Sequence, residues 1–211
     1  MAKGFFSRRH QAQVRRQELI DAALHLFAEK GYDGASIRDI ARRAGVTEAL
    51  VYHYFRSKEH LFEEVIKARS FVPVLRRVLN EMENAHPSAV LHQVMEEFLD
   101  MLWYNASMAR MFIIEFMRNP ICARYFRAIV EENTANLAQY LQEQQHRGVF
   151  RADIDAQAVA EMLLGMAFSL FFAWGQASER DWHQRRQRFL HHSVPLVLHS
   201  LYAHPPQAKE I

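Results

Sequence analysis

Cysteine, glycine and proline are scarce in this sequence. Its 211 residues include one cysteine, seven glycines and six prolines, whereas half of all residues are hydrophobic. A chain with so much apolar content and so few chain-breaking residues is not globally disordered. The single cysteine, Cys122, cannot form an intramolecular disulfide, which favours a reducing cytoplasm. Without a second, resolving cysteine, an incidental thiol is a simpler interpretation than a redox sensor.

Long hydrophobic runs and the common catalytic motifs are also missing. No apolar run reaches the roughly 18 residues that a membrane-spanning helix needs, and the basic opening segment lacks the hydrophobic stretch of a signal peptide. We therefore expect no membrane partner. The sequence has no glycine-rich phosphate loop, no G-x-S-x-G elbow and no H-E-x-x-H pair, so we expect no cofactor, no metal and no catalytic residues.

The charge of the chain is distributed unevenly. The first 60 residues carry 11 Lys and Arg against 7 Asp and Glu, and the remainder carries 15 against 17, so a net charge of +2 divides into +4 and −2. Five basic residues precede the first acid, Glu18: Lys3, Arg8, Arg9, Arg15 and Arg16. Such a basic arm suits contacts with phosphates or with the minor groove of DNA, although a solvated terminus would have the same composition.

A helix–turn–helix pattern runs from Ser36 to Lys58. Ser36 is a good helix N-cap, and apolar residues then recur at helical spacing up to Ala44. Gly45 supplies the backbone freedom that ends this helix, and Thr47 can cap a second one. Two short helices joined by a tight turn are typical of a DNA-binding helix–turn–helix, whose second helix enters the major groove. An ordinary helical hairpin inside an all-α domain is the alternative.

The outward side of the second helix carries groups that suit a groove floor and the phosphates beside it. These groups are Thr47, Glu48, Ala49, Tyr52 and His53. Ser57 then caps a further helix, and Lys58 lies in the first turn of that helix. A cation is unfavourable beside its own helix N-terminus unless an anion docks there, so Lys58 indicates a phosphate site.

The stretch from Arg16 to Val65 resembles the DNA-binding domain of the TetR (tetracycline-repressor) family of bacterial regulators. The resemblance rests on the segments L-I-D-A-A-L-H-L-F-A-E-K-G-Y, A-S-I-R-D-I-A-R-R-A-G-V and L-V-Y-H-Y-F-R-S-K-E-H-L-F. It covers about the first third of the chain, and the remainder is compatible in length and helical character. The resemblance implies a homodimer, a palindromic DNA operator, a C-terminal domain that responds to a small-molecule effector, and a bacterial cytoplasmic location, on the nucleoid when bound to DNA.

Carried over position by position, the resemblance also implies residue roles. Arg38 matches a base-contacting position, and Lys58 matches a phosphate-binding lysine. The recognition-helix contacts are matched by Thr47, Glu48, Ala49, Tyr52 and His53, with Tyr54 at the margin of the set. Glu48 departs from the small or basic residues common at its position. An acid there would accept from cytosine N4 or disfavour some bases, so it bears on the operator sequence.

The whole sequence predicts an all-α fold of about nine helices, without strand patterns or repeats. The first helix is expected over about Gln11 to Lys30. Residues 1–56 then form a three-helix DNA-binding head that is too small to be very stable alone, and residues 57–211 form a helical ligand-sensing and dimerisation domain. Pro73 predicts a kink or a boundary in the connecting helix, and Pro195 predicts a bend or an interruption in the last helix.

The second domain has two features that bear on function. The last two expected helices are apolar on more than one face, so they can pair with their copies in a four-helix bundle, unless they only complete an intrachain core. The middle helices are rich in Met and Phe, which suit an adaptable apolar pocket, although plain core has the same composition. We assign the pocket, for an apolar or aromatic effector, to Phe98, Leu102, Phe112, Phe116, Met117, Phe126 and Met166.

An enzyme is the alternative from another class. Glu83-x-x-His86 and Glu143-x-x-His146 have the spacing found in di-iron carboxylate bundles. Both pairs lie at predicted helix ends among polar neighbours, so surface capping is the better interpretation. The C-terminal histidines lack a Cys or carboxylate cluster and are interpreted as solvated or dimer-edge residues: His183, His191, His192 and His199. The prediction is therefore a ligand-responsive DNA-binding repressor and not an enzyme.

Overall fold

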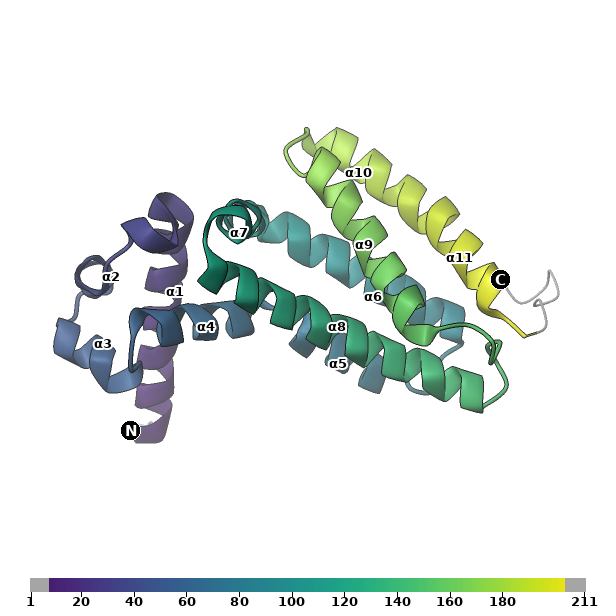
Figure 1. Cartoon of the computed structure of the whole chain (residues 1–211), viewed down its shortest axis with the longest axis horizontal. Coiled ribbons are helices and arrows are strands. Elements are labelled where there is room, and N and C mark those ends of the chain that lie inside the picture. The colour runs from purple at the N-terminus through teal and green to yellow at the C-terminus, as the bar shows by residue number, and fades with distance from the viewer. Residues whose placement is uncertain (1–7, 204–211) are drawn as a thin grey trace, which may run out of the picture. The chain divides into compact units, whose positions relative to one another are not determined.

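The chain folds into two compact units, which are described one at a time. A computed structural model describes residues 8–203, and the statements below concern this range. Unit 1 comprises Met1–Ser70 and Ser107–Arg127, and unit 2 comprises Phe71–Ala106 and Ala128–Ile211 (Figure 1). Of the predicted basic arm, Lys3 lies outside the described residues, as do the side chains of Arg8 and Arg9.

Unit 1 holds the predicted helix–turn–helix and the helices that support it. These are α1 (Arg8–Gly34), α2 (Ile37–Arg43), α3 (Glu48–Tyr54), α4 (Lys58–Arg69), most of α7 (Ala106–Arg118) and the first turns of α8 (Pro120–His146). The predicted N-caps are confirmed, because the hydroxyl groups of Ser36, Thr47 and Ser57 each accept a hydrogen bond from the backbone N–H three residues further on. Each cap satisfies a donor that the helix would otherwise leave free, and so fixes where α2, α3 and α4 begin.

The first helix is longer than predicted and contains a break at Gly31. It runs from Arg8 to Gly34, and at Gly31 the backbone has a φ of 72°. Residues with a side chain rarely adopt this left-handed conformation. A Cβ atom at this position would also lie 2.5 Å from Oε1 of Glu115 on α7. Glycine is therefore required at position 31 both by the backbone conformation and by the close approach of α7.

Unit 1 extends beyond the predicted head of residues 1–56 because its aromatic core needs later helices. Phe62 of α4 lies at the centre of this core. Its ring centroid is 5.2 Å from that of Phe27 and 4.8 Å from that of Tyr32, both on α1. On the other side it is 5.8 Å from Phe112 of α7 and 6.2 Å from Tyr125 of α8. The head therefore packs against α4, α7 and the start of α8, which supply apolar surface that a three-helix head lacks.

Asn119 joins the start of α8 to the end of α1. Its side chain is buried, and its Oδ1 atom accepts hydrogen bonds from the backbone N–H groups of Ile121 and Cys122, at 2.9 and 3.4 Å. Its Nδ2 atom donates to both carboxylate oxygens of Asp33, at 3.2 and 3.1 Å. One amide thus caps α8 and holds the last turn of α1, which carries the chain into the helix–turn–helix.

Unit 2 is a helical bundle. It contains α5 (Val72–Glu81), α6 (Pro87–Tyr104), the rest of α8, α9 (Ala156–Trp174), α10 (Glu179–Arg188), a π-helical turn η1 (Phe189–Ser193) and α11 (Val194–Leu201). Figure 1 shows α9 running alongside α10 and α11. Trp182 of α10 is buried and stacks on Trp103 of α6 with ring centroids 4.9 Å apart. Arg186, also buried, donates to the carboxylates of Glu96 and Asp100 at 2.9 Å each, which ties α10 to α6.

Both predicted proline breaks are present. The helix α4 ends at Arg69 and α5 begins at Val72, with Pro73 in its first turn, so the connecting segment has a boundary there. Pro195 lies in the first turn of α11, directly after the π-helical turn. If α4–α5 and α10–η1–α11 are each counted as one interrupted helix, residues 8–203 form the predicted nine. Their fold is all-α, with a single isolated β-bridge between Phe150 and Tyr202.

One prediction from the sequence is wrong: α9 does have the length and composition of a membrane-spanning helix. An 18-residue window of this 19-residue helix has a mean hydropathy of 1.6, and 39% of that window is buried within the structure. The prediction failed because Glu161 and some small residues interrupt the apolar run of α9, although the helix remains apolar on average. A core helix of a globular protein passes the same test, and α9 packs against α6 and α10.

Replacing Asn119 with Ala should lower the free energy of unfolding by about 1–3 kcal/mol, because the change removes a helix cap and leaves buried polar groups unpaired. Urea denaturation measures this loss. The matched control is Asn136→Ala, whose side chain donates only to the Glu132 carbonyl of its own helix and pairs with the exposed Arg76. We expect a change of less than about 0.5 kcal/mol for the control. Equal losses in the two variants would contradict the joining role of Asn119.

Candidate nucleic-acid interface

The turn between α2 and α3 fixes the direction of α3. Gly45 has a φ of 66°, and the next residue, Val46, donates its backbone N–H to the Ala41 carbonyl at 3.0 Å. This arrangement ends α2 with a left-handed residue, as the sequence predicts. Val51 within α3 and Phe55 directly after it are both fully buried. These two side chains anchor one side of α3 in the core of unit 1 and leave its other side in solvent.

The predicted recognition residues lie on this solvent side. The exposed members are Thr47, Glu48, Ala49, Tyr52 and His53. The Tyr52 side chain is 52% exposed although it is aromatic, and Tyr54 is half-buried with its ring 5.2 Å from that of His53. The structure therefore brings the predicted residues of α3 together on one face, which has the size and polarity of a surface that enters the major groove.

Arg38 differs from the other cations near α2 because it has no ion pair with any residue in the range 8–203. Arg42 pairs with Asp39 at 2.5 Å, and Arg43 pairs with Glu29 at 2.8 Å. Lys30 also reaches Asp39, at 3.3 Å. Arg38 is exposed on the first turn of α2. Its guanidinium is therefore left available for an external partner, whereas its neighbours on α2 are held by carboxylates.

Asp39 explains why these neighbouring cations are occupied. Its carboxylate accepts a hydrogen bond from the Ser36 hydroxyl at 2.9 Å and lies at the N-terminus of α2. The hydrogen bond from Ser36, followed by that from Lys30, holds the pKa of Asp39 below its usual value. Asp39 therefore stays ionised at neutral pH, where it completes the cap of α2 and binds Arg42 and Lys30.

Lys58 is placed differently from the sequence prediction. Its ammonium donates to the backbone carbonyls of Tyr32 and Ala35, at 2.9 and 3.2 Å, and lies 4.4 Å from the centre of the Tyr32 ring. These carbonyls lie at and just beyond the C-terminal end of α1, where the helix dipole favours a cation. Lys58 therefore ties the end of α1 to the start of α4. The phosphate contact remains a prediction, for which the third N–H of the ammonium is available.

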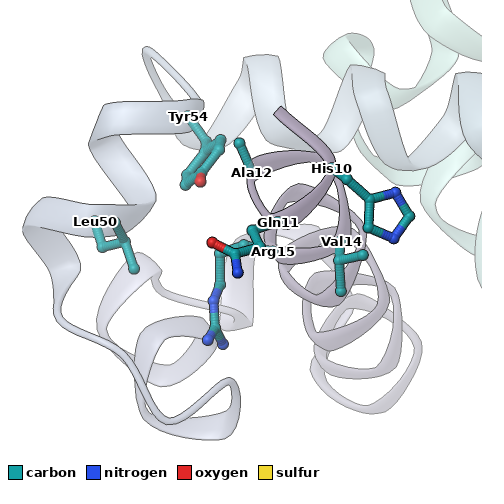
Figure 2. A pocket seen from close by; sticks show the side chains of 7 residues that line it. All are labelled: His10, Gln11, Ala12, Val14, Arg15, Leu50 and Tyr54. Carbon is teal, nitrogen blue, oxygen red and sulfur yellow. The ribbon is translucent and has the colours of Figure 1, made fainter. Parts of the chain in front are cut away.

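A groove runs between the first turns of α1 and one side of α3. It has a volume of about 700 Å³ and is lined by His10, Gln11, Ala12, Val14, Arg15, Leu50 and Tyr54. Figure 2 shows Gln11 and Arg15 on the side of α1 that faces Leu50 and Tyr54 of α3. Arg15 forms an exposed ion pair with Glu18 at 2.6 Å. Because exposed pairs of this kind contribute little, the Arg15 guanidinium can exchange Glu18 for a phosphate at small cost. Sequence reasoning placed Arg15 in a basic arm but did not place it beside α3.

The seven predicted pocket residues do not form one site within either unit. Phe112, Phe116, Met117 and Phe126 belong to unit 1, whereas Phe98, Leu102 and Met166 belong to unit 2. In unit 1, Phe116 and Phe126 pack with ring centroids 5.0 Å apart, and Met117 is 77% exposed. In unit 2, Phe98 packs on Phe71 at 4.8 Å as part of the core.

The other titratable groups that the sequence singles out have structural surroundings. Burial, followed by the charges of Glu115 and Asp33, raises the pKa of the Cys122 thiol to about 12. A neutral buried thiol is unreactive, which fits the interpretation as incidental. His86 of the first E-x-x-H pair caps α6 by accepting from the Ser88 backbone N–H. Within residues 8–203, no group of three or more His, Cys, Asp or Glu is arranged to hold a metal ion.

Comparisons with known proteins agree with this geometry. Residues 19–65 match the family model of bacterial regulatory proteins, tetR family. The HTH-type transcriptional regulator UidR of Escherichia coli K12 is 26% identical over 164 residues, which make up 76% of this chain and 81% of UidR. The HTH-type transcriptional repressor KstR2 of Mycolicibacterium smegmatis is 42% identical over 57 residues, 27% of this chain and 28% of KstR2. 

A solved structure extends the likeness to the whole fold. The transcriptional regulator FadR of Bacillus subtilis, in complex with stearoyl-CoA, superposes with a TM-score of 0.71 at 20% identity. The matched region covers 88% of this chain and 99% of FadR. At this identity the likeness concerns the fold alone, and it includes the arrangement of an N-terminal helix–turn–helix followed by a larger helical region.

Replacing Arg38 with Ala should weaken binding to a specific DNA site by about 1–3 kcal/mol and relax the preference at one base pair per half-site, because a base contact would be lost. Arg42→Ala is the matched control, since it removes the same charge from the same helix but its guanidinium is held by Asp39. Titrations of both variants with specific and random duplexes distinguish the two roles. If Arg38→Ala weakened binding to both duplexes equally, Arg38 would not read a base.

Replacing Lys58 with Met should lower the free energy of unfolding by about 1–3 kcal/mol, because two carbonyls lose a charged donor. The control on the same helix is Lys67→Met, where only exposed contacts to Glu63 and Glu64 are lost, and a loss below about 1 kcal/mol is expected. Urea denaturation measures both values. The salt dependence of DNA binding tests the phosphate contact separately, because losing one contact lowers the slope of log K against log salt by about one.

Proposed function

Because this chain belongs to the TetR family of bacterial transcriptional regulators, we propose that it binds a palindromic operator as a homodimer and acts as a repressor that a small-molecule effector releases. The relative KstR2 is a transcriptional repressor, and it matches 27% of this chain. A regulator of this kind acts in the bacterial cytoplasm, on the nucleoid when it is bound to DNA.

The observation that carries the DNA-binding part is the exposed face of α3 beside an unpaired arginine. Tyr52 and His53 present hydrogen-bonding side chains to solvent, and Arg38 is the cation of α2 that no carboxylate within residues 8–203 holds. We propose that Arg38 and this face read bases, and that Arg15 and the third N–H of Lys58 contact phosphates on either side. Glu48, exposed in the first turn of α3, would accept from cytosine N4 or reject bases that offer only acceptors.

The dimer is proposed to form through α9 and α11, because each leaves large apolar side chains in solvent. On α9, Met162 is 44% exposed and Phe172 is 68% exposed, and on α11 Leu196 is 75% exposed. Between the two residues of α9 lies Gly165, where an added Cβ would meet no atom within 4 Å. A glycine in the middle of such a face permits the close approach of a second helix. A two-fold axis through these helices would give two DNA-binding heads for two half-sites.

The effector is proposed to be an apolar or aromatic small molecule. The fold neighbour FadR was solved with stearoyl-CoA, a ligand with a long apolar chain. We propose that Phe98, Leu102 and Met166 of unit 2 contribute to such a pocket. An effector would bind more tightly to a conformation in which the spacing of the two heads does not match that of the half-sites. The ratio of its affinities for the two conformations sets how far operator affinity falls.

Selection of bound sequences from a random DNA pool, with purified protein, tests the proposal. We expect an enriched inverted repeat for the wild-type chain, and loss of that enrichment for Phe172→Glu, because a buried carboxylate at the dimer face would separate the subunits. Tyr104→Glu is the control, since Tyr104 is 82% exposed and belongs to α6, which is not one of the two helices of the proposed face. Light scattering should report a dimer for the wild type and the control, and a monomer for Phe172→Glu. A wild-type chain that enriches no symmetric sequence would refute the proposed function.

A further inference from the structure

A groove rich in histidine lies between α6 and the last helix of unit 2. Its volume is about 370 Å³, which is within the range of small-ligand sites. The start of α6 supplies His86 and His92, and the last helix supplies His191 and His199. The sequence separates these pairs by about a hundred residues, so sequence reasoning interpreted them as independent surface or capping groups. The fold places all of them around one groove.

The lining combines hydrogen-bond donors with an apolar floor. Besides the four histidines it includes Ser88, Tyr202, Ala89, Leu190, Pro195 and Leu198, and no Asp, Glu, Lys or Arg among residues 8–203 lines it. A ligand in this groove would therefore meet imidazole and hydroxyl groups on one side and aliphatic surface on the other. No carboxylate among the lining residues would repel an anion.

For His86 and His191, the neighbouring groups indicate which ring nitrogen carries a proton. Nδ1 of His86 accepts from the Ser88 backbone N–H and lies 2.7 Å from the Ser88 hydroxyl, so the proton of a neutral ring is on Nε2. Nε2 of His191 lies 2.8 Å from the side-chain carbonyl oxygen of Gln187, and an amide oxygen only accepts, so this nitrogen carries a proton. Both rings are therefore held in a defined orientation.

Three polar groups of the lining are left without a partner. Neither His92 nor His199 makes a hydrogen bond with another residue in the described part of the chain; His92 contacts the His191 ring at 6.0 Å between centroids. The side chain of Tyr202 is 8% exposed, and its buried hydroxyl makes no hydrogen bond of ordinary geometry with the described residues, although Ser88 lies close enough to act on its pKa. Buried polar groups are nearly always paired in native structures, so a ligand in the groove can complete the hydrogen bonding of this hydroxyl.

The backbone of the groove is unusual as well. His191 and Leu190 belong to the π-helical turn η1, where the last helix takes up one extra residue. Such turns are rare within α-helices and occur frequently at functional sites. The π-helical turn is a second observation, separate from the side-chain chemistry, and it lies at the groove.

We propose that this groove binds a small organic carboxylate with an apolar body. The imidazole N–H groups of His92 and His199 and the Tyr202 hydroxyl donate to the carboxylate, and Leu190, Pro195 and Leu198 contact the apolar part. A metal ion is a poorer match, because it needs three or more converging ligands and these are not arranged so within residues 8–203. An organic cation would find no carboxylate in the lining. The proposal concerns the ligand site alone and does not depend on DNA binding.

Isothermal titration of the full chain with hexanoate and phenylacetate tests this site, with hexanamide and phenylacetamide as neutral matches of the same shape. We expect one carboxylate to bind per chain, and each amide to bind about tenfold more weakly, because charge-assisted hydrogen bonds are stronger than neutral ones. His92→Gln and His199→Gln should each weaken carboxylate binding about tenfold, because each removes an imidazole N–H that donates to the charged carboxylate. Tyr202→Phe, which keeps the ring, should weaken carboxylate binding more than amide binding.

The matched control is His183→Gln, on the exposed surface of α10 and outside the groove lining. It should bind the carboxylates as the wild type does, and thermal unfolding should show that all four variants are folded. The proposal is overturned if the wild-type chain binds neither acid at millimolar concentration, if acids and amides bind equally, or if His183→Gln loses as much affinity as the groove variants.

Discussion

The packing of Phe62 between α1 on one side and α7 and α8 on the other is the interaction on which the DNA-binding head depends. Three short helices cannot bury enough apolar surface to hold α3 in one orientation. Phe62 supplies the missing centre, because its ring contacts Phe27 and Tyr32 of α1 as well as Phe112 and Tyr125. The head is therefore stable only as part of a unit that includes residues 107–127.

The end of α1 is the point where most of these supports converge. Lys58 donates to its carbonyls, Asn119 donates to Asp33, and Glu115 fills the space that a side chain at Gly31 would need. These contacts come from α4, from α7 and from the residue that caps α8, and together they determine how α1 passes the chain to Ser36. The position of the recognition face is thus set by groups that lie outside that face.

The sequence predicted the features that depend on local chemistry. The caps at Ser36, Thr47 and Ser57, the turn at Gly45 and the breaks near Pro73 and Pro195 are all readable because each follows from a residue and its immediate neighbours. The contacts of Lys58 could not be read in this way, since the carbonyls it binds lie 23 and 26 residues away. The histidine groove was missed for the same reason: His86 and His191 share a site only after α6 and the last helix have packed. The exposed face of α3 was predicted because helical spacing determines it, whereas the pocket residues depended on tertiary packing that spacing does not describe.

The π-helical turn of the last helix also changes which of the later side chains in that helix point inward. An uninterrupted α-helix continuing from the buried residues Trp182 and Arg186 would direct Ser193, Val197 and Ser200 inward. With the extra residue of η1, the buried positions are instead Val194, Leu198 and Leu201. One inserted residue therefore exchanges two serines for two leucines in the core of unit 2. Deleting a single residue anywhere from 189 to 193 would remove the extra residue, so a regular α-helix would then direct Val194, Leu198 and Leu201 inward and leave Leu196 pointing outward.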